Sequence, residues 1–472
     1  MGDLRVVADD GPGLPDAGAG DDSNATSSGA SSSGSSSSSS GSRGDGGDPL
    51  QNGNGGLGVV DLKSPTVVNA YAALAADVKA GSATITLDTA DAFDATSTVL
   101  VWQSAGLPPP PSGDASPVDL ASGPVGAFEL AIVTAKQGTM LTLARPLTQS
   151  YTSSSTQVVL VPNYQELTIE ASADIHALPW NGRSGGIVAF LVAGRLRNEG
   201  LIDADGAGSR GARAFTRAGG SLTSCPGIDG APSGGYGVKG EGVATAAFSP
   251  LGGPDAIGGR GNVANGGGGG QCHNAGGGGG GHAGAGGHGG RSGTFTSESE
   301  VGGLGGAPLM YEPSTRLAFG GGGGSGDADS TTGDPAVEGG SGGGVVFVRA
   351  ASFDGAGTIT ANGRSAASLA GNGGGGGGAG GLVSVDVTGA ASCTGLLRAS
   401  GGAGSTIDGS ALGTTGGGGG GRVVLRAQVA APTCKLEALG GAAGVQNDVG
   451  ATGGAAHGAT GGGPGVTLTV LR

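Results

Sequence analysis

The chain has 472 residues, of which 112 are glycine, 13% are charged and only 3% are aromatic. Large apolar side chains are too scarce to fill one conventional core along the whole length. The net charge of −14 disfavours nucleic acid and anionic membranes as partners, and no apolar stretch is long enough to span a bilayer.

Residues 1–57 are dominated by serine, glycine and aspartate, which predicts a disordered tether. The first residues have neither a basic end nor an apolar run, so they are not a signal peptide. We therefore expect either a protein that is not exported, or one whose export signal or lipid anchor lies upstream of this sequence. The tether and the acidic composition favour a secreted or cell-surface protein.

Residues 58–182 alternate apolar and polar side chains over short segments bounded by turn residues, which is typical of half-buried strands. Gln137-Gly138 predicts a tight turn between two of them. Short links indicate a small antiparallel barrel or sandwich. The six predicted strands are 82–89, 97–104, 127–135, 139–147, 156–162 and 165–171.

A repeat of about 40 residues fills the domain 183–472. Each unit has two glycines, an alternating strand, a turn, a second short strand and glycine again, which predicts stacked β-units. An insert at 209–340 separates the first unit from the rest. The units are 185–208, 343–363, 380–404 and 420–444, with a closing half at 463–472.

The two C-terminal glycine runs, 373–378 and 416–421, enter strands at the same place in the repeat, so we interpret the glycine runs as folded structure rather than linkers. A polyproline II helix has three residues per turn and no internal hydrogen bonds, so its amides can bond neighbouring chains if no side chain intervenes. The predicted fold class is therefore all-β, with a small β-domain, stacked β-repeats and a glycine-rich polyproline II bundle. The runs are 266–270, 276–281, 320–324, 373–378 and 416–421.

Four cysteines allow three pairings, and two disulfides are favoured over free thiols. Cys393 and Cys434 lie beside the turn of neighbouring units, about 4.8 Å apart if the units stack in register, which suits a disulfide. Cys225 and Cys272 would then pair by elimination. A one-residue offset between Cys393 and Cys434 leaves the first pairing open.

The segment GGGGGQCHNAGGGGGG (266–281) resembles the glycine-rich domain of the anaplastic lymphoma kinase receptor family and the tip adhesins of some phage tail fibres. That resemblance implies a polyglycine bundle that displays loops. Segments 67–88, 127–151 and 178–206 resemble secreted surface proteins of gliding and predatory bacteria, in which a small β-domain precedes glycine-rich repeats. This second resemblance implies no particular activity.

Polar loop tips between glycine legs are the predicted binding residues: Gln271, His273, Asn274, Asp408, Asn447 and Asp448. A calcium loop is a weaker hypothesis, because a threonine replaces the turn glycine and no helix flanks it; a solvated acidic loop is favoured. Its oxygen ligands would be Asp327, Asp329, Thr331 and Glu338. A metal site at Cys272 and the neighbouring histidines is disfavoured, and no other cofactor is expected.

Serine-elbow and dinucleotide-binding patterns occur only as chance matches among the glycines. Arginines and aspartates of the repeats lie at different offsets, so we interpret them as solvated strand faces: Arg349, Asp354, Arg364, Asp386, Arg398 and Arg426. We therefore expect no enzyme, but an extracellular structural or adhesive protein that binds a cell-surface glycan or protein. The alternative is a carbohydrate-active enzyme, a lyase or hydrolase, on a β-helix, which converging carboxylates and arginines would favour.

Overall fold

The structure is a computed structural model of the chain. It describes residues 50–121, 123–214, 228–229, 237–244, 258–271, 274–291, 302–327, 337–368, 372–408, 412–428, 433–447 and 456–472. These residues belong to one compact unit, Gly47–Arg472. The helices and strands assigned among the described residues are all strands, with no helix, which confirms the predicted all-β class.

Six strands form an antiparallel sheet in the order β2-β8-β4-β6-β7-β3. A bridge between Leu74 and Leu87 joins the ends of β2 and β3, so the sheet closes into a small barrel around its own apolar core. Gly138, with φ of 60°, makes the predicted tight turn between β6 and β7. The strands are β2 Tyr71–Ala73, β3 Thr84–Thr86, β4 Thr98–Gln103, β6 Phe128–Gln137, β7 Met140–Leu143 and β8 Thr156–Val161.

The sixth strand that we predicted for this sheet, 165–171, lies elsewhere. It forms β10 (Glu166–Ile169), which pairs in parallel with β1 and β12, and β2 takes its place in the barrel. Alternation predicts a half-buried strand but not the direction of its partner. Leu167 and Ile169 are fully buried in the core of the stacked repeats, and that core determines where β10 pairs.

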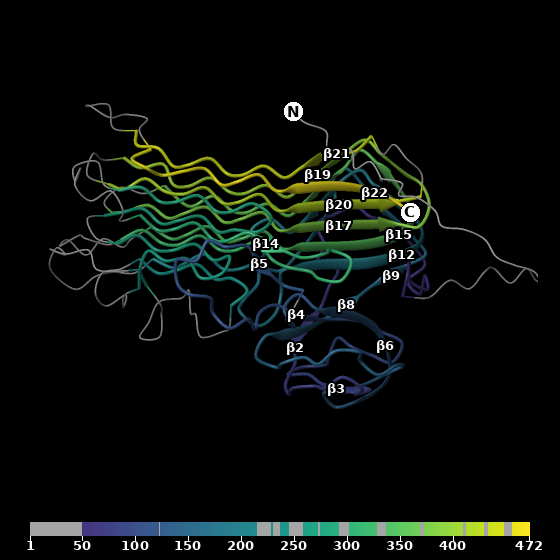
Figure 1. The fold of residues 1–472 in the computed structure, drawn as a ribbon. Coiled ribbons are helices and arrows are strands. Elements are labelled where there is room, and N and C mark those ends of the chain that lie inside the picture. The colour runs from purple at the N-terminus through teal and green to yellow at the C-terminus, as the bar shows by residue number, and fades with distance from the viewer. Residues whose placement is uncertain are drawn as a thin grey trace, which may run out of the picture. The chain divides into compact units, whose positions relative to one another are not determined.

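The repeats stack into two parallel sheets, and each repeat contributes one strand to each (Figure 1). Sheet A has nine strands and sheet B has five. Strands follow each other in chain order, and Ile187 of β12 pairs directly with Val345 of β15, so the long insert does not interrupt the stack. Valine and leucine side chains of both sheets fill the core between them.

Strand β10 with β11 forms one repeat more than the sequence predicts. Sheet A comprises β1 Val59–Leu62, β9 Asn163–Tyr164, β10, β12 Ile187–Asn198, β15 Val345–Gly355, β17 Leu382–Val387, β18 Ala391–Cys393, β20 Arg422–Ala427 and β22 Val466–Leu471. Sheet B comprises β11 Asp174–His176, β13 Leu201–Asp203, β16 Thr358–Thr360, β19 Leu396–Arg398 and β21 Lys435–Glu437. A separate short pair joins β5 Val118–Asp119 and β14 Leu309–Met310.

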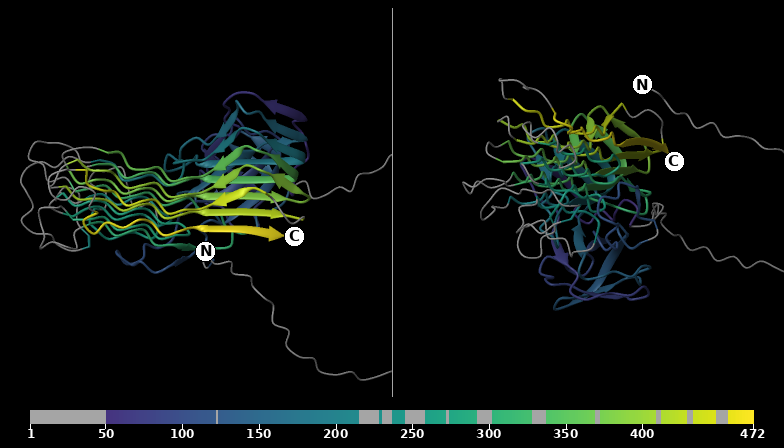
Figure 2. Two further views of the ribbon diagram at one scale, coloured as in Figure 1. Left: turned by 90° about the horizontal axis from the view of Figure 1, so that it is seen from above. Right: turned by 60° about the vertical axis from the view of Figure 1, so that its left-hand side comes forward.

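Glycine-rich segments run side by side away from the strands (Figures 1 and 2). In the run 276–281, Gly277 and Gly280 donate backbone hydrogen bonds to Gly374 and Gly377, both at 2.9 Å. Partners on each side therefore recur every three residues, which is the period of a polyproline II helix. Hydrogen bonds to two further segments recur at the same interval. Gly276 and Gly279 donate to Gly290 and Gly287, and Gly278 and Gly281 donate to Gly268 and Asn265.

The bundle leaves no room for side chains at most of these positions. A Cβ built on Gly418 would lie 1.9 Å from the carbonyl oxygen of Gly378, and one on Gly376 would lie 2.1 Å from that of Gly278. Cβ atoms do not approach backbone oxygens that closely, so the two glycine segments would have to move apart. The close approach that makes the hydrogen bonds is available only to glycine.

Replacing Gly418 by valine should therefore lower the free energy of unfolding by about 3 kcal/mol or more, and even alanine should have an effect of this size. Gly463→Ala is the matched control, because its Cβ would meet its nearest atom at 3.3 Å, and it should cost less than about 1 kcal/mol. Urea unfolding of the three variants checks this. Equal stability of Gly418→Ala and Gly463→Ala would contradict the packing argument.

Cys393 and Cys434 form a disulfide with Cα atoms 5.1 Å apart, which confirms the predicted pairing. Cys393 ends β18 and Cys434 directly precedes β21, and the Thr433 hydroxyl donates to the Cys393 carbonyl at 2.8 Å. The bond links neighbouring repeats. The second predicted pair, Cys225 and Cys272, lies outside the described residues.

The disulfide closes a loop of 41 residues. In the chain-entropy treatment this corresponds to about 4 kcal/mol of stabilisation. The double variant Cys393→Ala/Cys434→Ala should lose roughly that amount in urea unfolding, with an m-value that is equal or larger because its unfolded chain is less compact. A loss below about 1 kcal/mol would show that the repeats hold this register without the bond.

Candidate functional site

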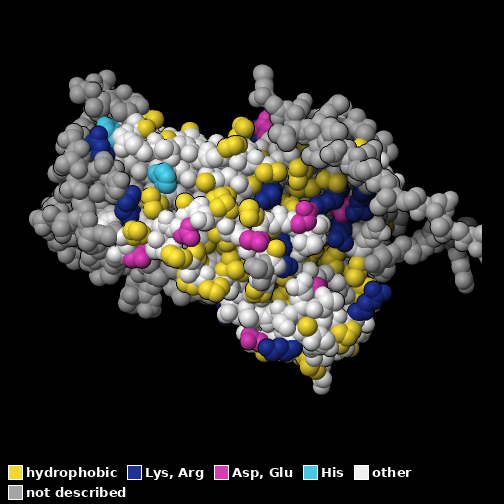
Figure 3. Space-filling model, viewed as in Figure 1, with side chains coloured by type: hydrophobic (Ala, Val, Ile, Leu, Met, Phe, Trp, Pro, Cys, Tyr) yellow, Lys and Arg dark blue, Asp and Glu magenta, His cyan; other side chains and the backbone are white. Residues whose placement is uncertain are grey.

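The outer face of sheet A is covered by other parts of the chain. Trp102 of the barrel packs in one apolar cluster with Ile187 and Phe347 of the sheet. Over β20, Arg422 donates to the Leu309 carbonyl at 2.8 Å, and its guanidinium carbon lies 4.6 Å from the centre of the Tyr311 ring. Basic and acidic side chains lie among apolar ones on this face (Figure 3).

Three charged residues of this face lie opposite one another: Arg349, Asp386 and Arg426 on β15, β17 and β20. Our expectation that they occupy different offsets of the repeat was wrong. The third strand pairs from Arg422 rather than from Val423, and that one-residue difference brings Arg426 into line. The side chains of Asp386 and Arg426 are only 14% and 13% exposed.

Asp386 and Arg426 both form ion pairs. Arg426 pairs with Glu312 at 3.0 Å, and Arg472 pairs with Asp386 at 2.5 Å. Arg426 of β20 thus pairs with a residue just beyond the end of β14, and Asp386 of β17 pairs with the residue that follows β22. This column of charges therefore fastens the structure together and is not available to a ligand.

The outer face of sheet B carries the more open set of polar side chains. Register aligns His176, Asp203, Thr360, Arg398 and Glu437 on five neighbouring strands. The side chains of His176 and Arg398 are 39% and 40% exposed. Because adjacent strands lie about 4.8 Å apart, the column extends over roughly 19 Å.

Asp203 is the carboxyl group of this column with the most unusual surroundings. Its Oδ1 accepts hydrogen bonds from the Asp205 N–H at 2.7 Å and from the Thr360 hydroxyl at 3.3 Å. Burial raises the pKa of the Asp203 carboxyl, and the negative charges of Asp205 and Asp174 raise it further, although the two hydrogen bonds oppose the shift. Asp203 therefore keeps its proton to higher pH than an ordinary aspartate does.

A second column, two residues along the chain, holds Asp205. Its two carboxylate oxygens accept the backbone N–H of Asn362 at 2.6 Å and the Asn362 side-chain amide at 2.9 Å. The Asn362 oxygen in turn accepts the Ser400 N–H at 2.8 Å, and the Ser400 hydroxyl accepts the Leu439 N–H at 3.2 Å. In this column, each repeat thus donates hydrogen bonds that position the polar side chain of the preceding repeat.

On the first of these strands, the His176 Nδ1 lies 2.9 Å from the Asp174 carboxylate. The charges of Asp174 and Asp205 both act on the Asp203 carboxyl, and the imidazole of His176 and the guanidinium of Arg398 belong to the same column. A carboxyl group with a raised pKa beside two further carboxyl groups is an arrangement that can serve general acid–base catalysis. We regard this face as the candidate site.

Of these residues, Arg398 was singled out from the sequence. The others were not predicted: Asp174, His176, Asp203, Asp205 and Glu437. A signal was present in a four-residue pattern that begins at the last residue of β13, β16, β19 and β21: a variable residue, alanine, a second variable residue and glycine. Strand β11 departs from it, because proline rather than glycine stands at position 179. Alignment on that pattern puts both polar columns in register. The four copies are DADG (203–206), TANG (360–363), RASG (398–401) and EALG (437–440).

Among the predicted loop-tip residues, the structure brings together Asp408 and Asn447. Both are exposed, Ile407 bridges to Gln446 in parallel, and the Asn447 N–H donates to the Ile407 carbonyl at 2.9 Å. Gln271 is only 1% exposed and packs inside the bundle. Asn274 is half-buried with φ of 58°. His273 and Asp448 lie outside the described residues.

The suggested calcium loop is described only at its ends. Asp327 is fully buried, its Oδ2 accepts the Asn274 N–H at 3.2 Å, and Glu338 is exposed on the facing leg of the hairpin. Asp329 and Thr331 lie outside the described residues. Within the described ranges, no three His, Cys, Asp or Glu side chains are grouped to hold a metal ion.

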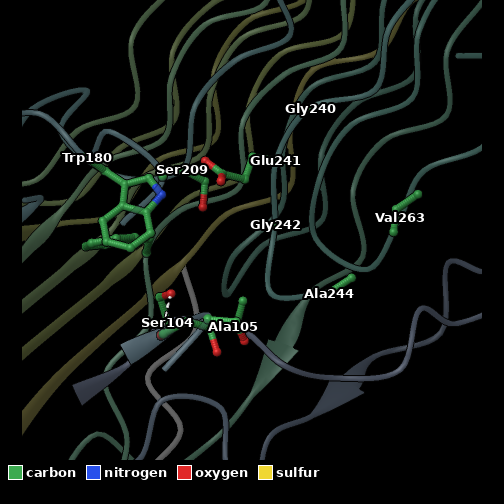
Figure 4. A pocket seen from close by; sticks show the side chains of 13 residues that line it. Ser104, Ala105, Trp180, Ser209, Gly240, Glu241, Gly242, Ala244 and Val263 are labelled. Atoms are coloured by element: carbon green, nitrogen blue, oxygen red, sulfur yellow. Dashed lines mark hydrogen bonds between the residues drawn. The ribbon is translucent and has the colours of Figure 1, made fainter. Parts of the chain in front are cut away.

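A cavity of about 30 Å³ lies where the barrel, the repeats and the bundle meet, lined by Trp180, Ser104, Ser209 and Glu241 (Figure 4). It has room for only a few water molecules, far less than a saccharide needs. The Arg210–Glu241 ion pair closes one side at 2.8 Å. This cavity is a packing feature, and it is separate from the polar columns of sheet B.

No protein-family model matches the chain, and no curated protein matches it. Three solved structures that match are phage tailspikes: Gp54 of Acinetobacter baumannii bacteriophage AP22 in complex with A. baumannii capsular saccharide, gp49 of Pseudomonas phage LKA1, and gp61 of Pseudomonas phage phi297. Identities are 10%, 11% and 13%, and TM-scores are 0.17, 0.16 and 0.16. The matches cover 82%, 82% and 83% of this chain, which spans 62%, 64% and 66% of the tailspikes.

Our expectation that the chain is not an enzyme is contradicted by these comparisons, and we withdraw it. The matching proteins are tailspikes, and one of them was solved with a capsular saccharide. No residue role is carried over from them to this chain. The part of the chain that the structure describes contains no long apolar helix of the kind that crosses a bilayer.

One buried histidine connects the bundle to sheet A. His282 is fully buried, and its Nε2 lies 2.8 Å from the Tyr311 hydroxyl, whose ring lies against Arg422. Burial holds the pKa of His282 well below its ordinary value, and the positive charge of Arg422 lowers it further. Burial also lowers the pKa of His288, whose Nδ1 accepts the Gly305 N–H at 3.1 Å.

The folded protein should therefore lose stability on mild acidification. Above about pH 6.5 these histidines are neutral in both states, but below it only the unfolded chain takes up their protons, so the free energy of unfolding falls. Each histidine contributes at most about 1.4 kcal/mol per pH unit. Urea unfolding between about pH 7.5 and 5.5 should show a shallower dependence in His282→Gln than in the unsubstituted chain. Equal slopes would refute this assignment.

Proposed function

We propose that the chain is a secreted or cell-surface protein that binds a carbohydrate polymer on the outer face of sheet B and cleaves it by general acid–base catalysis. The observation that carries the proposal is the Asp203 carboxyl, which keeps its proton to raised pH beside the Asp205 and Asp174 carboxyl groups. Saccharides present hydroxyl groups in rows, and the exposed amides, hydroxyls, carboxylates and guanidinium of the two columns can bond them.

In this proposal Asp203 donates its proton to the leaving glycosidic oxygen, and Asp205 accepts a proton from the attacking water. The two N–H donors of Asn362 position the Asp205 carboxylate for that role. Arg398, paired with Glu437 through one carboxylate oxygen, keeps part of its guanidinium exposed for the polymer. The glycine bundle, which we infer to be of polyglycine II type, would act as a rigid support.

A second candidate function is adhesion through the loop ends of the bundle, favoured by the exposed neighbours Asp408 and Asn447. The two candidates use opposite ends of each repeat. Adhesion alone requires no protonated carboxyl group and leaves the polar columns of sheet B without a role. Substitution of Asp203 therefore separates the two.

The test is release of reducing ends from a panel of bacterial capsular and exopolysaccharides. Asp203→Asn should lower the rate by about 10²–10⁴-fold, and the rate of the unsubstituted chain should fall as pH rises through the raised pKa of Asp203. Asp354→Asn is the matched control, because Asp354 is an aspartate of sheet A paired with Arg195, and it should leave the rate unchanged. Binding of a polysaccharide without cleavage, or equal rates for the two variants, would refute the proposal.

A further inference from the structure

Among the residues that the structure describes, no strand pairs with the far side of β22, which is therefore an open edge of sheet A. It is the last strand in the sheet order and lies at the margin of the stack (Figure 2). Five of its six residues are exposed. Leu468, Val470 and Leu471 are 40%, 37% and 57% exposed. Open edges are usually protected from pairing by charged residues, proline or a bulge. The sequence VTLTVL has no charged residue and no proline, and its pairing with β20 is regular.

The backbone groups that face away from the sheet can be assigned. The Val466 N–H donates to Gly421, and the Arg472 N–H donates to Ala427, so the even-numbered residues of this strand direct their N–H groups toward β20. Alternate residues of a parallel strand bond to opposite sides. Thr467, Thr469 and Leu471 therefore present free N–H and C=O groups at the open edge.

Residues 466–470 read VTLTV in both directions. If a second copy pairs antiparallel about a twofold axis at Leu468, Val466 lies opposite Val470 of the second copy and Thr467 lies opposite Thr469 of the second copy. Leu468 lies opposite itself. Valine then meets valine and threonine meets threonine, which are favourable cross-strand pairs.

The same register also satisfies the backbone. In an antiparallel pair, opposite residues alternate between pairs that exchange two hydrogen bonds and pairs that exchange none. Centring on Leu468 makes Thr467 and Thr469 the hydrogen-bonded pairs, and these are the residues whose groups are free at the edge. Side-chain matching and backbone matching thus select one register independently.

We propose that two copies of this chain associate through β22, antiparallel and centred on Leu468, so that their A sheets join into one. A second copy fits better than an unrelated strand because the palindrome gives each of these five positions an identical or matching partner. The strand is uncharged, so a chain with a net charge of −14 meets no like charges there. A twofold contact of this kind closes on itself and forms a dimer rather than a fibre.

Cysteine crosslinking tests the register. Residue 468 would face its own copy in a pair that exchanges no hydrogen bonds, with Cα atoms about 4.5 Å apart, which suits a disulfide. Leu468→Cys should therefore form a crosslinked dimer under mild oxidation. Val466→Cys is the matched control and should not crosslink alone, but should do so when mixed with Val470→Cys. No dimer from Leu468→Cys, or equal crosslinking of Val466→Cys alone, would overturn the proposal.

Light scattering over a dilution series tests the association without added cysteines. The unsubstituted chain should reach the mass of a dimer, and Leu468→Lys should raise the dissociation constant at least about tenfold, because two lysines would then meet at the axis. Leu178→Lys, at an exposed leucine away from β22, should leave it unchanged. A monomer at all concentrations, or a dimer that Leu468→Lys does not weaken, would overturn the proposal.

Discussion

The structure depends on backbone hydrogen bonds between glycine segments of the chain, which have no side chains where they meet. Gly277, for example, donates to Gly374, and a Cβ on it would lie 2.2 Å from the oxygen of Gly324. Ordering glycine costs more backbone entropy than ordering any other residue. The cost is offset because neighbouring glycine segments bond one another on several sides, so backbone polar groups buried in the bundle find partners.

Stacking of the repeats converts positions in the sequence into columns in space. A residue at one offset of a repeat lies next to its counterpart in the next repeat, so a single polar position becomes a row of polar side chains. On sheet B this produces the row from His176 to Glu437 and the row from Asp205 through Asn362 to Ser400. The bundle and the columns arise from the same register, because each repeat contributes a strand to each sheet and a leg to the bundle.

The two sheets differ in what their outer faces do. On sheet A, the barrel covers β12 and β15, and the segment around Tyr311 covers β20, so charges such as Asp386 and Arg426 act in ion pairs between parts of the chain. On sheet B, the side chains of His176 and Arg398 are 39% and 40% exposed, although that of Glu437 is only 13% exposed. The two faces therefore differ in what covers them and not in residue type.

The sequence by itself predicted the all-β class and the folded state of the glycine runs, and it favoured the Cys393–Cys434 pairing that the structure then confirmed. Each follows from a local pattern that repeats: alternation, glycine at a fixed offset, or a cysteine beside the same turn. Only the tertiary structure decided that β10 leaves the barrel for the repeats, that Arg349, Asp386 and Arg426 align, and that Asp174 lies near Asp203. Those outcomes depend on pairing partner and register, and a shift of one residue, as between Arg422 and Val423, changes which side chains meet without changing the pattern of apolar residues.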